Sequence, residues 1–294
     1  MGNPAVPEGP VETAFEKRAA RAELLARGPV TAAEPLRFAC GLYRVQGRLA
    51  TAIEFLNAER PLSGRLEADA DRLLDRGGGL LRFAAEHGPP GLTDVAQARQ
   101  REDASGARSR LLDWWSGEHQ TGEDYLSRAL LRPYVEVLAR LRMAPDRLHR
   151  PGHCPFCGGP PWIAARRGGS GRTEVSPQLE ERARIHFARA KDADGETARR
   201  LLGCALCGGE WPLGRILCPC CGEGDPVKLP SFQSDSHPTV RIEACESCRR
   251  YVKSIDLTVD GRAIPEVDDL VSLSMDLWAA GEGFTRIEPG LAGV

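Results

Sequence analysis

Residues 153–158 read His-Cys-Pro-Phe-Cys-Gly, and three further Cys-x-x-Cys pairs follow by residue 248. The four pairs are Cys154/Cys157, Cys204/Cys207, Cys218/Cys221 and Cys245/Cys248. Two thiolates separated by two residues can turn inward on a tight loop and occupy two corners of one tetrahedron. Two such loops complete a closed site, with metal–sulfur distances of about 2.3 Å for zinc. The stretch therefore predicts two metal ions, each bound by four cysteines, and both iron and zinc accept this ligand set.

A glycine follows the second cysteine in three of the four pairs, at Gly158, Gly208 and Gly222. A residue at this place in a metal-binding loop often needs a positive φ angle, which glycine adopts without a steric penalty. Arg249 stands there in the fourth pair. We therefore expect the fourth loop to differ from the other three.

A redox dithiol is the rival interpretation of a Cys-x-x-Cys pair. A thioredoxin-like site uses a single pair at the start of a helix, within a βαβ pattern. Four pairs in a glycine-rich segment that is poor in helix do not fit this arrangement. The odd cysteine, Cys220, lies inside the third pair, and we interpret it as a bystander thiol.

The spacing leaves the grouping of the pairs open. Sequential grouping joins the first pair to the second and the third to the fourth. The alternative joins the second to the third across ten residues, 208–217, which could form a hairpin or a single strand of up to about 33 Å. Basic residues near the pairs could offset the negative charge of the thiolates: Arg166, Arg167, Arg215, Arg249, Arg250 and Lys253.

The composition of the whole chain excludes several classes of protein. Its 294 residues hold 39 basic and 41 acidic side chains, a formal net charge of −2 that gives no general attraction to nucleic acid or anionic membrane. No apolar run approaches the roughly 20 residues that span a bilayer, and residues 1–6 do not begin a signal peptide. We therefore expect a cytoplasmic protein, with no nucleic acid as a partner and no membrane insertion.

The first 150 residues predict a helical domain. Helix formers with apolar residues at helical spacing occupy 11–27, 33–57, 62–86 and 125–143. We expect three consecutive glycines, 77–79, to interrupt the third run, and 88–109 to be a loop or a poorly formed helix. The apolar stripes are interpreted as the seams of a helical bundle, with Cys40 as a small buried residue.

After Pro151 glycine, proline and cysteine replace the helical pattern, so the fold class is α+β. We expect a helical domain at 1–150 and a metal-binding domain at 151–294, with a charged insertion at about 168–197 whose middle, 178–191, could form a helix. Strand-like runs cover 211–217, 240–244 and 251–259. A last helix is expected over 267–280, with one apolar face formed by Val267, Leu270, Val271, Leu277 and Trp278.

Five motifs, taken in order, resemble the formate dehydrogenase accessory proteins of the FdhE type. They read His-Cys-Pro-Phe-Cys-Gly-Gly-Pro-Pro at 153–161, Arg-Leu-Leu-Gly-Cys-Ala-Leu-Cys-Gly-Gly-Glu-Trp at 200–211, Arg-Ile-Leu-Cys-Pro-Cys-Cys-Gly at 215–222, Glu-Ala-Cys-Glu-Ser-Cys-Arg-Arg-Tyr-Val-Lys at 243–253 and Val-Asp-Asp-Leu at 267–270. The resemblance covers the carboxy-terminal half closely and the amino-terminal half only as a helical domain of suitable length. The chain departs from the family pattern at the insertion, at Pro212, where the family often has His, and at Arg249, where it often has Gly.

The resemblance implies two rubredoxin-like, or zinc-ribbon-like, modules of four cysteines each after the helical domain, and then a carboxy-terminal helix. It supports the sequential grouping and gives a metal-binding role to all eight paired cysteines. It also implies an accessory protein, or chaperone, that binds the catalytic subunit of a molybdenum- or tungsten-dependent formate dehydrogenase during maturation.

Two other functions compete with this one. A zinc-ribbon adaptor would bind nucleic acid or another protein, but residues 151–264 hold 16 basic and 14 acidic side chains, which give little electrostatic attraction for nucleic acid. An enzyme would need a reactive site. A closed four-cysteine site leaves no coordination position for a substrate, and the sequence shows neither a nucleophile–base signature nor a phosphate loop. We therefore expect no catalytic residues.

Overall fold

The described residues fall into two compact units. A computed structural model describes residues 11–117, 125–168, 199–214 and 216–293. One unit ends at Leu148 and the other begins at His149. The helix expected at 178–191 lies outside the described residues. The division into domains at 1–150 and 151–294 stays a prediction, because compactness alone does not test independent folding.

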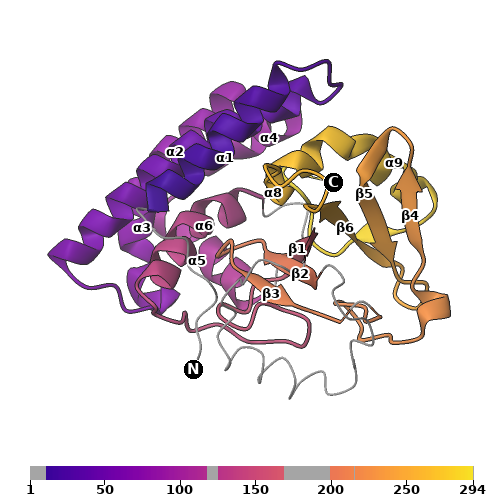
Figure 1. Ribbon diagram of the computed structural model, residues 1–294. Helices are drawn as coiled ribbons and strands as arrows, with labels where there is room; N and C mark the ends of the chain where they lie inside the picture. The colour runs from indigo at the N-terminus through magenta and orange to yellow at the C-terminus, as the bar shows by residue number, and fades with distance from the viewer. Residues whose placement is uncertain (1–10, 118–124, 169–198, 215, 294) are drawn as a thin grey trace. The chain divides into compact units, whose positions relative to one another are not determined.

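The first unit is a bundle of helices, as expected. Its helices are α1 (Val11–Ala26), α2 (Ala33–Glu59), α3 (Leu66–His87), α4 (Pro90–Gln100), α5 (Ala104–Ser116) and α6 (Tyr125–Arg140). The long helix α2 packs against α1, α3 and α6, and Figure 1 shows α1 and α2 side by side. Cys40 lies on α2 and is buried, which confirms its place in the core.

Two expectations for this unit were wrong. The glycines at 77–79 do not interrupt α3; an added Cβ on Gly77 would lie 2.7 Å from Leu130 Cδ1, so the missing side chain lets α6 approach closely. Residues 88–109 are mostly helical and not a loop. Pro90 lies in the first turn of α4, where no hydrogen-bond donor is needed, and the Asp103 side chain caps α5 by accepting from Gly106 N at 2.7 Å.

The second unit is built on one sheet. Its strands are β1 (Pro161–Arg167), β2 (Arg199–Cys204), β3 (Glu210–Pro212), β4 (Ser231–Ser234), β5 (His237–Ala244), β6 (Arg250–Asp256) and β7 (Thr285–Arg286). Among the described residues the order is β3-β2-β1-β6-β5-β4, with β7 paired to β6. The strands β1 and β6 run parallel, with Ile163 opposite Lys253, whereas β1–β2 and β5–β6 are antiparallel. This parallel pairing joins the strands of both cysteine modules into a single sheet.

The sequence patterns found β5 and β6 but missed β1, β2, β4 and β7. The middle of β1 is Ala164-Ala165, and alanine is a weak strand former, so this central strand gives little signal. The strand expected at 211–217 is shorter and ends at Pro212, which cannot donate a backbone hydrogen bond to a neighbouring strand.

The carboxy-terminal helix is interrupted. It consists of α8 (Pro265–Asp268), the 3-10 turn η3 (Asp269–Ser272) and α9 (Leu273–Gly281). Val267 and Leu270 are buried as expected, but Leu277 is 68% exposed and Trp278 is 41% exposed. A 3-10 turn has about three residues per turn, so the helical phase shifts at η3 and Met275 and Ala279 are buried instead.

The expected α+β class is confirmed: a helical amino-terminal region, strands that carry two groups of four cysteines, and a helix near the end. Within the described ranges, none of the helices combines the length and the apolar character needed to cross a bilayer.

Candidate metal centres

The eight paired cysteines gather in two groups. The first holds Cys154, Cys157, Cys204 and Cys207, and the second holds Cys218, Cys221, Cys245 and Cys248. Within each group the sulfur atoms lie within 4.8 Å of one another. The sequential grouping is thus the one that the fold adopts, and the grouping of the second pair with the third is wrong.

The sulfur–sulfur distances fit a metal site and do not fit disulfides. Four contacts between the pairs span Cys154–Cys207 at 3.6 Å, Cys157–Cys204 at 3.4 Å, Cys218–Cys248 at 3.7 Å and Cys221–Cys245 at 3.6 Å. A disulfide would bring the sulfurs to about 2.05 Å. A tetrahedron with metal–sulfur distances of about 2.3 Å has edges of about 3.8 Å. Each group could therefore hold one metal ion with little movement.

All four loops share one backbone pattern. In each, the first cysteine donates its amide to the carbonyl five residues later, in the pairs Cys154–Gly159 (2.8 Å), Cys204–Gly209 (2.9 Å), Cys218–Glu223 (2.8 Å) and Cys245–Arg250 (2.9 Å). The residue after the second cysteine has a positive φ in every loop, between 56° and 76°. This turn directs both thiols to the same side of the loop.

The expectation that the fourth loop would differ at Arg249 was wrong. Arg249 takes the same left-handed conformation as the glycines, with φ 56°, and donates its amide to Cys245 O at 2.8 Å. Its guanidinium carbon lies 3.8 Å from the centre of the Phe284 ring, and the group also hydrogen-bonds to Glu246 and to the Glu282 carbonyl. Because these contacts hold the side chain, they offset the cost of a non-glycine residue in this region.

The first group is buried on all four cysteines. Burial and hydrogen bonding to neighbouring thiols raise the pKa of Cys154 well above the ordinary thiol value, and hydrogen bonds with the other three thiols do the same for the pKa of Cys207. Burial also opposes ionisation of Cys204, but hydrogen bonds from the other three thiols outweigh it and lower the pKa of Cys204 well below that value. Its sulfur also accepts the Leu206 amide at 3.4 Å. A metal ion must therefore displace protons from this group.

The second group is partly open to solvent. Cys218 and Cys245 are buried, Cys248 is half-buried and Cys221 is exposed. Burial raises the pKa of Cys218 to about 11 and, with neighbouring thiols, also raises the pKa of Cys248. Cys220 is exposed and lies outside both groups, as expected for a bystander thiol.

Glu223 ties the two loops of the second group together, a role that the sequence did not reveal. Ser247, in the fourth loop, donates its hydroxyl to Glu223 Oε2 at 2.6 Å. The other carboxylate oxygen accepts the amides of Gly224 and Asp225 at 3.0 Å each. These hydrogen bonds, led by that of Ser247, lower the pKa of Glu223 to about 2, so the carboxylate stays ionised.

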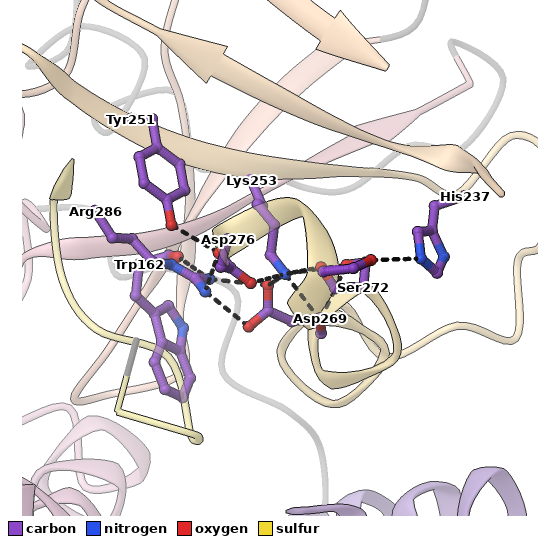
Figure 2. A network of polar contacts seen from close by, with 9 residues as sticks. Trp162, His237, Tyr251, Lys253, Asp269, Ser272, Asp276 and Arg286 are labelled. Atoms are coloured by element: carbon purple, nitrogen blue, oxygen red, sulfur yellow. Dashed lines mark hydrogen bonds and ion pairs between the residues drawn. The ribbon is translucent and has the colours of Figure 1, made fainter. Parts of the chain in front are cut away.

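Lys253 does not offset the thiolates; it lies in a buried ion network (Figure 2). Its Nζ contacts Asp276 Oδ2 at 2.5 Å and Asp269 Oδ1 at 2.9 Å, and donates to Ser272 Oγ at 3.0 Å. Arg286 reaches both carboxylates and donates to the Trp162 carbonyl at 2.9 Å. The network therefore links β6, η3, α9 and β7 to β1.

Tyr251 joins this network, and His237 lies beside it. Tyr251 donates its hydroxyl to Asp276 Oδ1 at 2.8 Å, and burial, followed by the nearby carboxylates, raises the pKa of Tyr251 far above its ordinary value. His237 Nε2 lies 3.2 Å from Ser274 Oγ and is not part of either cysteine group. The motifs at 243–253 and 267–270 thus meet in space through Lys253 and Asp269.

Comparison with known proteins agrees with these motifs. Residues 216–291 match the family model described as FdhE, C-terminal domain. The chain is 26% identical to a protein named Protein FdhE homolog from Aquifex aeolicus, over 73% of this chain and 68% of the relative. It is 27% identical to the Protein FdhE homolog of Pseudomonas putida, over 96% of this chain and 88% of the relative.

The crystal structure of the FdhE protein from Pseudomonas aeruginosa has the same fold. It matches with a TM-score of 0.64 at 22% identity, and the match covers 99% of this chain and 98% of that one. The expected resemblance is thereby confirmed.

Proposed function

We propose that this chain is a member of the FdhE family and an accessory protein that binds the catalytic subunit of formate dehydrogenase and is required for its maturation. The observation that carries the proposal is the pair of four-cysteine groups on one sheet, each built from motifs in the order typical of this family. The helical unit, which is larger than the support of two metal ions requires, is proposed as the surface that meets the subunit.

We further propose that each group binds one iron or zinc ion, through Cys154, Cys157, Cys204 and Cys207 in the first site and Cys218, Cys221, Cys245 and Cys248 in the second. The sulfur geometry and the loop amides that point at sulfur fit either ion. When bound, zinc would supply cross-linking of the loops alone, and iron would add one-electron chemistry.

The proposed role is not enzymatic. Four protein ligands close a tetrahedral site, so neither metal would offer a position to a substrate. Eight reduced thiols suit the reducing cytoplasm, where we place the protein. We also propose that residues 1–150 and 151–294 act as separate domains, one for the partner and one for the metals.

The decisive experiment compares a deletion strain with its parent for formate dehydrogenase activity per unit of dehydrogenase polypeptide. We expect the polypeptide to be present in the deletion strain and its specific activity to be low. The full chain restores activity, and an affinity-tagged copy recovers the catalytic subunit. A Cys154→Ser/Cys157→Ser chain is the test variant and Cys220→Ser the matched control, since Cys220 lies outside both groups.

Equal specific activity in the two strains, together with no recovered dehydrogenase subunit, would overturn the proposal. The chain would then be an adaptor of another system. If a chain that carries no metal still recovered the subunit, the subunit would remain the proposed partner. The metal ions would then not be needed to bind it.

A further inference from the structure

A cavity of about 130 Å³ lies within the second unit, where strands β1, β2, β5 and β6 approach the loop of Cys218. Charged residues from all four strands line it: Arg166, Arg200, Arg241, Glu243 and Arg250. The described residues thus surround it with four guanidinium groups and one carboxylate. The lining carries an excess of positive charge, although the whole chain is close to neutral.

Glu243, the one carboxylate that the described residues contribute to this lining, is already paired with Arg200. Arg200 is buried and donates its Nε to Glu243 Oε2 at 2.7 Å. Its Nη1 donates to the carbonyls of Gly214 and Leu217 at 3.2 and 3.3 Å. Arg200 and Glu243 therefore satisfy each other, and the described part of the cavity wall offers the remaining arginines no second carboxylate.

The side chains of Arg166, Arg241 and Arg250 have hydrogen-bond donors that no described residue accepts. Arg166 Nη1 lies 3.8 Å from Asp256 Oδ2, which is too long for a hydrogen bond. Arg250 donates one N–H to the Arg286 carbonyl at 3.1 Å. Arg241 has no side-chain hydrogen bond or ion pair in the parts of the chain that the structure describes, although it is half-buried. A guanidinium group has five N–H donors, so most of those on these residues lack an acceptor among the described residues.

The strand register brings like charges together at this place. Arg166 of β1 is directly opposite Arg200 of β2. Like charges at directly opposed positions destabilise a sheet. Glu243 offsets the charge of Arg200, whereas the carboxylate nearest to Arg166 is 3.8 Å away, so an anion beside Arg166 would reduce the remaining repulsion.

The neighbouring cysteine group does not satisfy these donors. Cys218 and Cys245 line the same cavity, so thiolates bound to a metal would lower its positive potential. None of the four arginines, however, donates a hydrogen bond to a cysteine sulfur among the described residues. The guanidinium groups are thus near the metal ligands in space and are not bonded to them.

We propose that this cavity is a binding site for one oxyanion, held by Arg166, Arg241 and Arg250. The class comprises carboxylates and small inorganic oxyanions, because guanidinium groups match both through paired N–H···O hydrogen bonds. The volume admits one such group and is well below the roughly 300 Å³ at which cavities take drug-sized molecules. The inference goes beyond the proposed function and does not depend on it.

The test is a calorimetric titration of the full chain as purified with sodium sulfate at constant ionic strength, with sodium chloride as the reference salt. We expect saturable binding of one sulfate per chain. Arg241→Gln, and separately Arg166→Gln, should weaken it about tenfold or more, as the loss of a charge-assisted hydrogen bond would. Arg262→Gln is the matched control, since this arginine is 88% exposed and does not line the cavity.

Metal content is measured for every variant, because it shows whether the arginines bind the oxyanion or support the cysteine group. No saturable binding of sulfate beyond chloride, or equal affinity in Arg241→Gln, would overturn the proposal. So would loss of metal from the Arg241→Gln chain with unchanged sulfate affinity, because the arginines would then serve the cysteine group. Competition by a short glutamate-rich peptide would identify a polypeptide carboxylate as the ligand, and sulfate binding without such competition would identify a free inorganic oxyanion.

Discussion

The ammonium group of Lys253 lies 2.9 Å from the carboxylate of Asp269, and both side chains are buried. One residue belongs to β6 and the other to η3, so the pair fastens the helical end of the chain to the sheet. Asp276 and Arg286 bring the network to two cations and two anions. Charges are tolerated inside a protein when each has such partners, and the loss of one partner leaves the others uncompensated.

Replacing Lys253 with Met should therefore destabilise the second unit by about 3–5 kcal/mol. Denaturant unfolding followed by tryptophan fluorescence measures this free energy. Lys228→Met is the matched control, because Lys228 is half exposed and its ion pair with Glu223 is long, at 3.7 Å. The loss of such a surface ion pair should change stability by less than about 1 kcal/mol. Similar values for the two variants would show that the network does not stabilise the fold.

Arg249→Gly should keep both metals and change stability by less than about 1 kcal/mol. Glycine relieves the positive φ, but it removes the contact with Phe284, and the two effects are of similar size. Arg249→Val should instead cost at least about 1 kcal/mol, because a β-branched residue resists this conformation and supplies no such contact. Measured metal content and unfolding free energy decide the matter, and a more stable Val variant would contradict it.

The two metals should leave at different rates. A chelator in excess should remove close to one ion per chain quickly and the other slowly, because Cys221 is exposed whereas all four cysteines of the first group are buried. Absorbance of the chelator complex follows the release. The Cys218→Ser/Cys221→Ser chain should lack the fast phase, and Cys220→Ser should keep both phases. A single phase for two ions in the unaltered chain would count against this asymmetry.

Metal occupancy should fall as the pH is lowered. In the metal-free state the pKa values of Cys154, Cys207 and Cys248 lie above the ordinary thiol value and that of Cys218 is about 11, so these thiols are protonated at neutral pH. The metal must displace those protons, and each displaced proton weakens binding by about 1.4 kcal/mol per pH unit of acidification. Elemental analysis after equilibration between pH 8 and pH 5 with a competing chelator tests this. Constant occupancy over that range would refute it.

A fragment of residues 151–294 should bind two metal ions on its own. The sheet that carries both cysteine groups lies within the unit that begins at His149. Metal stoichiometry and a cooperative unfolding transition that chelation abolishes would support it. A fragment that binds metal only when residues 1–150 are added in trans would show that the two parts do not fold independently.

The cysteine groups could be predicted because their signal is local. Two thiols and a glycine within five residues define a loop such as that of Cys154, Cys157 and Gly158, whatever the rest of the chain does. The grouping needed the family resemblance, since spacing permits two solutions. The conformation of Arg249 could not be read from its neighbours, because Phe284, which holds it, lies far along the chain.

The buried network and the central strand had no such local signal. A lysine is usually on the surface, and nothing near Lys253 in the sequence indicates Asp276, which lies 23 residues away. The partner of β1 is β6, so the strand that joins the two modules is stabilised by pairing that no window of sequence contains. The exposed face of α9 was predicted wrongly for a related reason, because the turn at η3 changes the helical phase.

The parallel pairing of β1 with β6 has a consequence for synthesis on the ribosome. The antiparallel strands β1 and β2 emerge first, whereas β6 is made only after residues 205–249. During that interval the other edge of β1 presents unpaired amide and carbonyl groups, the kind of edge that recruits foreign strands. A nascent chain in which β1 and β2 have already paired therefore still exposes this edge. Slow translation across residues 205–249 should lengthen the time during which the edge can pair with a wrong strand.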